Sequence, residues 1–133
     1  MLENAAKPAE QNDDAYHGLM TVDSEVPNGN FTYWIGILFP ANTEEPEGFC
    51  CLDLPEGDVG IAWIYGSEQN GEIYGEKPHK ACYEKLREDG RGDLNTNAGG
   101  KNTLVFFERY NCPRYTTPDE KGNVILDYGF YLR

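Results

Sequence analysis

The sequence predicts an α+β fold, in which one helix packs against a mostly antiparallel sheet. Segments with strand-like patterns of apolar residues lie on both sides of a single stretch with helical character. Fifteen glycines and eight prolines among 133 residues indicate many turns, which is typical of a fold rich in strands. A chain of this length is expected to form one domain with its own core.

The first two strands are expected at 16–23 and 31–39, as a hairpin joined by the turn-forming sequence SEVPNGN. The second of them, FTYWIGILF, is apolar on both faces, so we expect both of its faces to be covered. The preceding residues 1–14 are polar and acidic and are expected to form a flexible N-terminal arm. The folded domain should therefore span residues 15–133.

Two further strands are expected at 49–54, FCCLDL, and at 59–66, VGIAWIYG, with the turn PEGDV between them. A helix is expected within 67–90. Pro78 should lie in its first turn, because proline lacks the N–H that an interior position must donate. Gly90 is a suitable C-terminal stop. This helix is the helical part of the expected α+β fold.

The charge of the chain restricts the class of its partners. Eleven basic residues against 23 acidic ones give a net charge of −12. This charge argues against binding of nucleic acid and of anionic membranes, and it favours cationic partners, although it also serves solubility. The sequence contains neither a signal peptide nor a long apolar run, so we expect a cytoplasmic protein.

The residues with metal-binding or nucleophilic chemistry form no convincing site. The four cysteines, Cys50, Cys51, Cys82 and Cys112, have neither zinc-ligand nor disulfide-framework spacing, and we expect reduced thiols that pack as small apolar groups. No nucleophile elbow or phosphate-binding loop is present. We therefore expect no metal and no cofactor.

The closing strands, expected at 103–110 and 123–133, place a carboxylate among aromatic residues. Alternation puts Phe106, Glu108 and Tyr110 on one face and Arg109 on the other, so Arg109 cannot neutralise Glu108 by adjacency. A cationic ligand surrounded by aromatic rings would supply both a partner charge and packing. The alternative is a glutamate at a strand end that meets water or pairs with a lysine or arginine.

Three segments in this order resemble the GyrI-like, or SOUL-type, effector-binding domain, the ligand-sensing module of AraC- and MerR-type multidrug-response regulators. FTYWIGILF resembles the family's aromatic strand, with Tyr33 and Gly36 on matching positions. LPEGDVGIAWIYGS resembles its turn and following strand. FFERY and LDYGFYLR resemble its closing strands, with Glu108, Asp127 and Arg133 on matching positions.

The resemblance implies two βαββ units related by a pseudo-twofold axis, with a cleft that binds lipophilic, often cationic, molecules. Glu108 is then the anionic contact. The other expected ligand-binding residues are aromatic: Tyr33, Trp34, Trp63, Tyr65, Phe106, Tyr110 and Tyr131. From the sequence pattern alone, an ordinary core position is the favoured alternative for Trp34, Trp63 and Tyr65. The hypothesis is a binding module for hydrophobic cations. A gyrase-inhibitor-like protein-interaction module and a small hydrolase that uses Glu108 are the alternatives.

The sequence also departs from the family pattern. Residues 1–16 are too few for the strand and helix that normally open the first unit, so this unit should be shortened, and a homodimer could cover the exposed sheet. Gly129 stands where relatives carry an aromatic residue, and Tyr131 stands where they carry proline. No helix-turn-helix segment is present, so the chain does not read as a complete transcription regulator.

Overall fold

The computed structural model describes residues 15–23, 31–95 and 102–133. The expected N-terminal arm at 1–14 and the first turn at 24–30 lie outside the described residues. Five strands and one helix are present in the described part, which confirms the α+β class. They are β1 (Tyr16–Asp23), β2 (Phe31–Gly36), β3 (Val59–Gly66), α1 (Glu76–Glu88), β4 (Asn102–Tyr110) and β5 (Val124–Tyr131).

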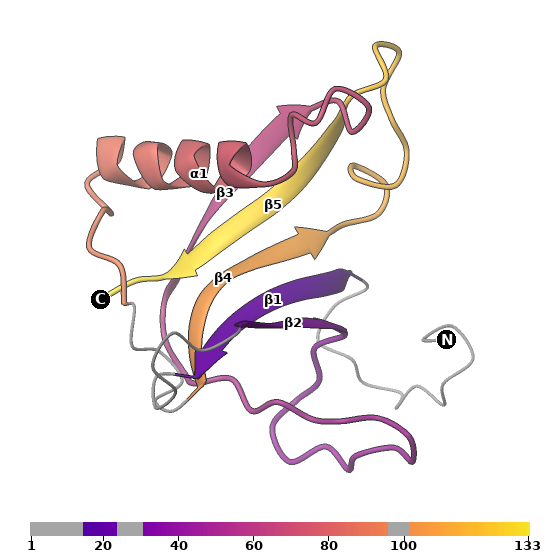
Figure 1. Ribbon diagram of the computed structural model, residues 1–133, viewed down its shortest axis with the longest axis vertical. Coiled ribbons are helices and arrows are strands. Elements are labelled where there is room, and N and C mark those ends of the chain that lie inside the picture. Colours follow the sequence, from indigo (N-terminus) through magenta and orange to yellow (C-terminus); the bar gives the residue numbers. More distant parts are fainter. Residues whose placement is uncertain (1–14, 24–30, 96–101) are drawn as a thin grey trace.

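The strands form one antiparallel sheet in the order β2-β1-β4-β5-β3 (Figure 1). β1 and β4 lie at its centre, and each has its hairpin partner, β2 or β5, on its outer side. β2 and β3 are the two edge strands of the sheet. Within the described residues, the fold is thus one βαββ unit, β3-α1-β4-β5, joined to one hairpin, β1-β2.

The helix defines two faces of the sheet. α1 packs over β3 and β5, on the face that carries Tyr128 and Phe130 (Figure 1), and we call it the helix face. Paired residues of neighbouring strands point to the same side. Glu108 pairs with Tyr128 and therefore lies on the helix face, whereas the pair Arg109 and Asp127 lies on the other side, which we call the open face.

The main core forms between α1 and the sheet. Pro78 lies in the first helical turn, as expected, and Cys82 and Leu86 are buried against the sheet. Gly60 permits this approach, because an added Cβ would lie 2.7 Å from Leu86 Cδ2. Gly90 follows the helix with φ of 75°, a left-handed conformation that favours glycine at this stop. Both helix ends thus follow the sequence prediction.

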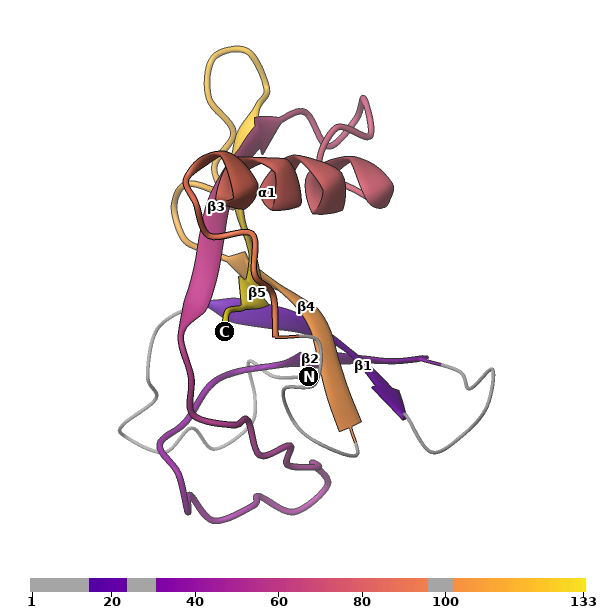
Figure 2. The same cartoon turned by 90° about the vertical axis from the view of Figure 1, so that its left-hand side faces the viewer.

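The prediction of a strand at 49–54 was wrong, because these residues form no strand. The second strand is also shorter than predicted, since β2 ends at Gly36 instead of at residue 39. Residues 37–58 form a loop, seen in Figure 2 beyond β1 and β2 at the end of the sheet away from α1. Proline lacks the N–H that a strand must donate, and Pro40 and Pro46 begin two tight turns of this loop. Leu52 and Leu54 still bury apolar surface, by packing on the open face.

Two expectations about burial were also wrong. Phe31 and Ile35 of β2 are 61% and 69% exposed, because α1 covers β3 and β5 and does not extend to β2. Of the four cysteines only Cys82 is buried. The other three are exposed, since they lie in loops outside the core: Cys50, Cys51 and Cys112.

Candidate functional site

The carboxylate of Glu108 lies where three strands of the helix face meet. Glu108 is half-buried on β4, and its partner on β1 is Gly18. Tyr33 comes from β2, one strand further out, and crosses β1 to reach it. An added Cβ at Gly18 would lie 2.0 Å from the Tyr33 hydroxyl oxygen and 3.3 Å from Glu108 Oε2. Gly18 therefore leaves the space through which the tyrosine reaches the carboxylate.

Two phenols donate hydrogen bonds to this carboxylate. The Tyr33 hydroxyl lies 2.7 Å from Glu108 Oε2, and the Tyr110 hydroxyl donates to the same oxygen. The two hydroxyl oxygens are 3.2 Å apart. We call Tyr33, Glu108 and Tyr110 the Glu108 cluster. Hydrogen bonds to a charged acceptor are stronger than neutral ones, so the two phenols hold the carboxylate in position.

The aromatic surroundings of the cluster come from β4, β5, α1 and the loop after β4. The Tyr115 ring meets the Tyr110 ring edge-on at 4.7 Å. Phe106, two residues before Glu108 on β4, stacks on Tyr128 with 5.1 Å between ring centroids. His79 of α1 contacts Phe106 edge-on and shares a hydrogen bond of 3.0 Å with the Tyr128 hydroxyl. The carboxylate thus borders an aromatic wall that continues to the helix.

The phenols of the cluster remain protonated over the physiological pH range. Burial raises the pKa of Tyr33 to about 12, and the neighbouring carboxylate adds to this effect. Burial, followed by the hydrogen bonds to Glu108 and Tyr33, also raises the pKa of Tyr110 well above its usual range. Because both phenols stay neutral donors, the charge of the cluster is the single negative charge of Glu108.

No lysine, arginine or histidine among the described residues lies within 4 Å of the Glu108 carboxylate. Arg109 points to the open face, where its Nη1 lies 3.0 Å from Asp127 Oδ2. Arg114 donates to both carboxylate oxygens of the same buried aspartate. The expectation that Arg109 cannot serve Glu108 is therefore confirmed, and within the described residues Glu108 has hydrogen-bond donors but no counter-charge.

The remaining aromatic residues predicted for the site do not join the cluster. Trp34, Trp63, Tyr65 and Tyr131 all lie on the open face. Trp63 is 65% exposed, with the Arg114 guanidinium 4.7 Å above its ring. The hydroxyl of Tyr131, a buried residue, donates to the Pro55 carbonyl at 2.8 Å. Of the predicted residues, the structure gathers Tyr33, Phe106, Glu108 and Tyr110 on one face.

Sequence reasoning missed Gly18, Tyr115, Tyr128 and His79 as neighbours of the cluster. For Gly18 a signal existed, since glycine inside a strand often marks a close approach of another group. Tyr128 enters through the register of β5, His79 through the position of α1, and Tyr115 through the path of the loop after β4, none of which a single sequence specifies.

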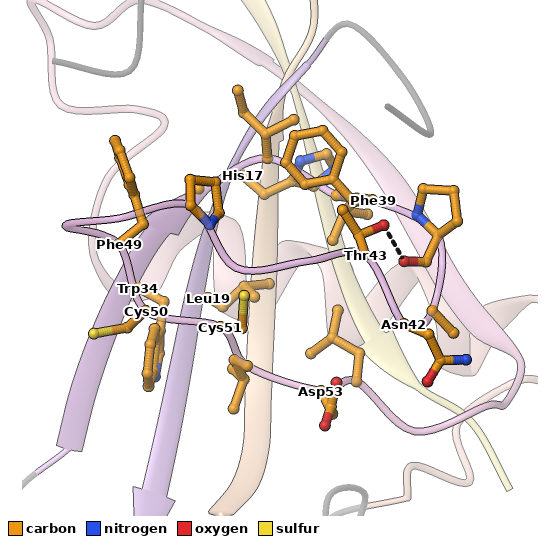
Figure 3. A pocket seen from close by; sticks show the side chains of 18 of the residues that line it. His17, Leu19, Trp34, Phe39, Asn42, Thr43, Phe49, Cys50, Cys51 and Asp53 are labelled. Carbon is orange, nitrogen blue, oxygen red and sulfur yellow. Dashed lines mark hydrogen bonds between the residues drawn. The ribbon is translucent and has the colours of Figure 1, made fainter. Parts of the chain in front are cut away.

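The open face contains a cavity of about 590 Å³ between the sheet and the 37–58 loop (Figure 3). Leu19 and Trp34 contribute from the strands, and Phe39, Cys50 and Cys51 contribute from the loop. Sheet alternation separates this cavity from the Glu108 cluster, because Gly18 and Leu19 are consecutive residues that point to opposite faces.

The described residues contain no group of three or more histidine, cysteine, aspartate or glutamate side chains arranged to hold a metal ion. In the same part of the chain, no helix combines the length and apolar character needed to cross a membrane. Comparisons with protein-family models, with curated proteins and with solved structures give no match.

Proposed function

We propose that this protein binds lipophilic cations on the helix face, with the Glu108 carboxylate as the counter-charge. The observation that carries this proposal is the state of Glu108: half-buried, fixed by two neutral phenols, and without a described basic partner. A carboxylate in such surroundings gains most from a partner that brings positive charge and little bound water.

The surface beside the cluster suits the apolar part of such a ligand. Phe31 and Ile35 flank Tyr33 on the same face of β2, and both are exposed. A ligand with its charge at Glu108 can cover these side chains and contact the tyrosine rings. Contact between a cation and an aromatic ring contributes about 0.5–2 kcal/mol, depending on how far the pair is shielded from water. The net charge of −12 also attracts cations to the surface.

The strand order supports the proposal independently of the cluster. The hairpin followed by a βαββ unit is the order that a GyrI-like domain would have if its first strand and helix were missing. The resemblance assigns Glu108 the role of anionic contact. The cytoplasmic location that we propose is supported by four free cysteines, three of them exposed, as expected where thiols stay reduced.

Titration with rhodamine 6G or tetraphenylphosphonium tests the proposal. We compare the wild type with Glu108→Gln, which keeps the shape of the side chain and removes its charge, and with Glu84→Gln. Glu84 is an exposed residue of α1, so this control changes the net charge equally. Loss of the charge pair should weaken binding by roughly tenfold, about 1.4 kcal/mol, in the Glu108 variant alone. Equal dissociation constants for the two variants would exclude the proposed role of Glu108.

A hydrolase is the second candidate, because the cluster places two protonated phenols beside a carboxylate. The carboxylate could activate a water molecule while a phenol donates to a developing oxyanion. Turnover of p-nitrophenyl esters that is abolished in Glu108→Gln and reduced in Tyr110→Phe would support this function. Ester turnover that both variants retain would remove it.

A further inference from the structure

The cavity on the open face lies between two layers of the chain. Its floor is the surface of β1 and β2, and its roof is the loop that follows β2 (Figure 3). At the far end the loop is fixed to the sheet, because the Tyr131 hydroxyl donates to the Pro55 carbonyl and the Leu132 amide donates to the Asp58 carbonyl, each at 2.8–2.9 Å. The roof is therefore attached at both ends.

Two tight turns shape the middle part of the roof. The Thr43 hydroxyl donates to the Pro40 carbonyl at 2.7 Å, as the dashed line in Figure 3 marks. The Phe49 amide donates to the Pro46 carbonyl at 3.2 Å. On the floor, the Trp34 indole donates to Thr21 Oγ1 at 3.0 Å, which fixes the ring and satisfies its N–H. A ligand that contacts the ring of Trp34 therefore does not need to accept a hydrogen bond from the indole N–H.

The charges around the cavity select for a neutral molecule. The described residues that line it include no lysine or arginine. Its titratable side chains include the buried His17 and the carboxylates of Glu44 and Asp53, which are exposed to water. An anionic ligand would approach two like charges. A cationic ligand would find carboxylates only where solvent weakens their attraction to about 1 kcal/mol. The interior offers mainly aliphatic and aromatic contacts, which favour uncharged apolar surface.

We propose that this cavity binds a neutral, lipophilic small molecule with a flat aromatic or hydrocarbon body, at a site separate from the Glu108 cluster. A volume of about 590 Å³ lies within the range of pockets that enclose drug-sized ligands. The site uses the face of the sheet opposite to Glu108, so its ligand needs no contact with that carboxylate.

Nile red, a neutral dye whose emission shifts to the blue in apolar surroundings, is the probe. We expect saturable binding, with weaker binding of the anion 1-anilinonaphthalene-8-sulfonate. Cys50 and Cys51 line the cavity and Cys112 lies elsewhere, so thiol alkylation by iodoacetamide provides a second readout. Bound dye should slow alkylation of Cys50 and Cys51 several-fold and leave Cys112 unchanged. Equal rates at all three thiols with and without dye would overturn the proposal.

Substitutions separate this site from the helix face. Phe39→Asp places a charge in the cavity and should weaken Nile red binding by roughly tenfold. Phe31→Asp makes the same change on the exposed helix-face side of β2 and is the control, and Glu108→Gln should leave Nile red affinity unchanged. If either of these two weakens Nile red as much as Phe39→Asp does, the dye binds on the helix face and the proposal fails. Thiol protection in the wild type decides the matter if Phe39→Asp does not fold.

Discussion

Replacement of Gly18 by alanine is expected to dismantle the Glu108 cluster without unfolding the sheet. The new methyl carbon would lie 2.0 Å from the Tyr33 hydroxyl oxygen and 2.8 Å from the ring carbon that bears it. Both distances are far inside van der Waals contact. Tyr33 is 42% exposed, so its side chain can rotate into water more readily than β1 can move. The expected result is a folded protein in which Tyr33 has left Glu108.

Two opposing contributions set the change in stability. The lost hydrogen bond from Tyr33 to the Glu108 carboxylate contributes about 1.5–3 kcal/mol when buried, and less here because the tyrosine is partly in water. Alanine is more favourable than glycine in a strand by about 0.5–1 kcal/mol. We therefore expect the free energy of unfolding to fall by about 1 kcal/mol, within the normal range for single substitutions. The pKa of Tyr33 should return from about 12 to about 10.0.

The assay combines urea unfolding, titration of tyrosinate absorbance with pH, and rhodamine 6G binding. Gly36→Ala is the matched control, because a Cβ at Gly36 would meet nothing within 4 Å. The Gly18 variant should lose one of the late-titrating phenols and bind the dye more weakly, and the Gly36 variant should do neither. A Gly18 variant with the wild-type tyrosinate titration and dye affinity would refute the reasoning that glycine gives Tyr33 access to the carboxylate.

Three further predictions follow from the two faces of the sheet. Asp127→Asn should lower the free energy of unfolding by about 3–5 kcal/mol, because Arg109 and Arg114 lose their buried carboxylate partner. Chemical unfolding measures this change, and the control Asp93→Asn, at an exposed ion pair, should leave the free energy of unfolding nearly unchanged. Since the folded-state pKa of Tyr33 is raised from 10.0 to about 12, its contribution to stability is complete below pH 10 and is lost as the pH rises through 12. Unfolding measured as a function of pH should show a smaller loss of stability in Tyr33→Phe than in the wild type over this range, and an equal loss in both would contradict the prediction. In the absence of ligand, we expect a second copy to pair with the β2 edge and to cover its exposed apolar side chains, from which a bound ligand would displace it. Sedimentation without ligand should show a dimer that dissociates in Ile35→Lys and persists in Thr32→Lys, whereas a monomeric wild type would contradict this.

The sequence predicts the strands and the helix where local rules are sufficient. β1 and β3 begin and end at the predicted residues, since alternation and flanking turn residues define both. The helix limits follow from Pro78 and Gly90. The segment FCCLDL has strand-like side chains and no pairing partner, because a strand requires a neighbouring backbone as well as a suitable pattern. Hydrogen bonding between distant segments is not encoded in any local window.

The site was predicted only as far as a single strand allows. Alternation within β4 correctly separated Glu108 from Arg109. The same rule cannot say which side of β3 or β5 shares a face with Glu108, since that depends on register between strands. Trp63 and Tyr65 were therefore predicted as ligand contacts from their aromatic side chains alone, and the observed register places both on the open face. Gly18 was the informative residue: a strand glycine opposite a glutamate gives Tyr33 its route.

The stability of Glu108 by itself does not reveal its function. Two hydrogen bonds from phenols to a carboxylate contribute about 1.5–3 kcal/mol each when buried, and they can offset the cost of removing part of its hydration. The fold thus tolerates this charge with or without a ligand, and unfolding experiments on Glu108→Gln leave both possibilities open. Gly18 does not separate the two roles. Glycine weakens the central strand β1 by about 0.5–1 kcal/mol relative to alanine, but it also leaves the space for the hydrogen bond from Tyr33 to Glu108, and the loss of that bond makes Gly18→Ala destabilising. Ligand affinity is therefore the measurement that distinguishes a binding role from a structural one.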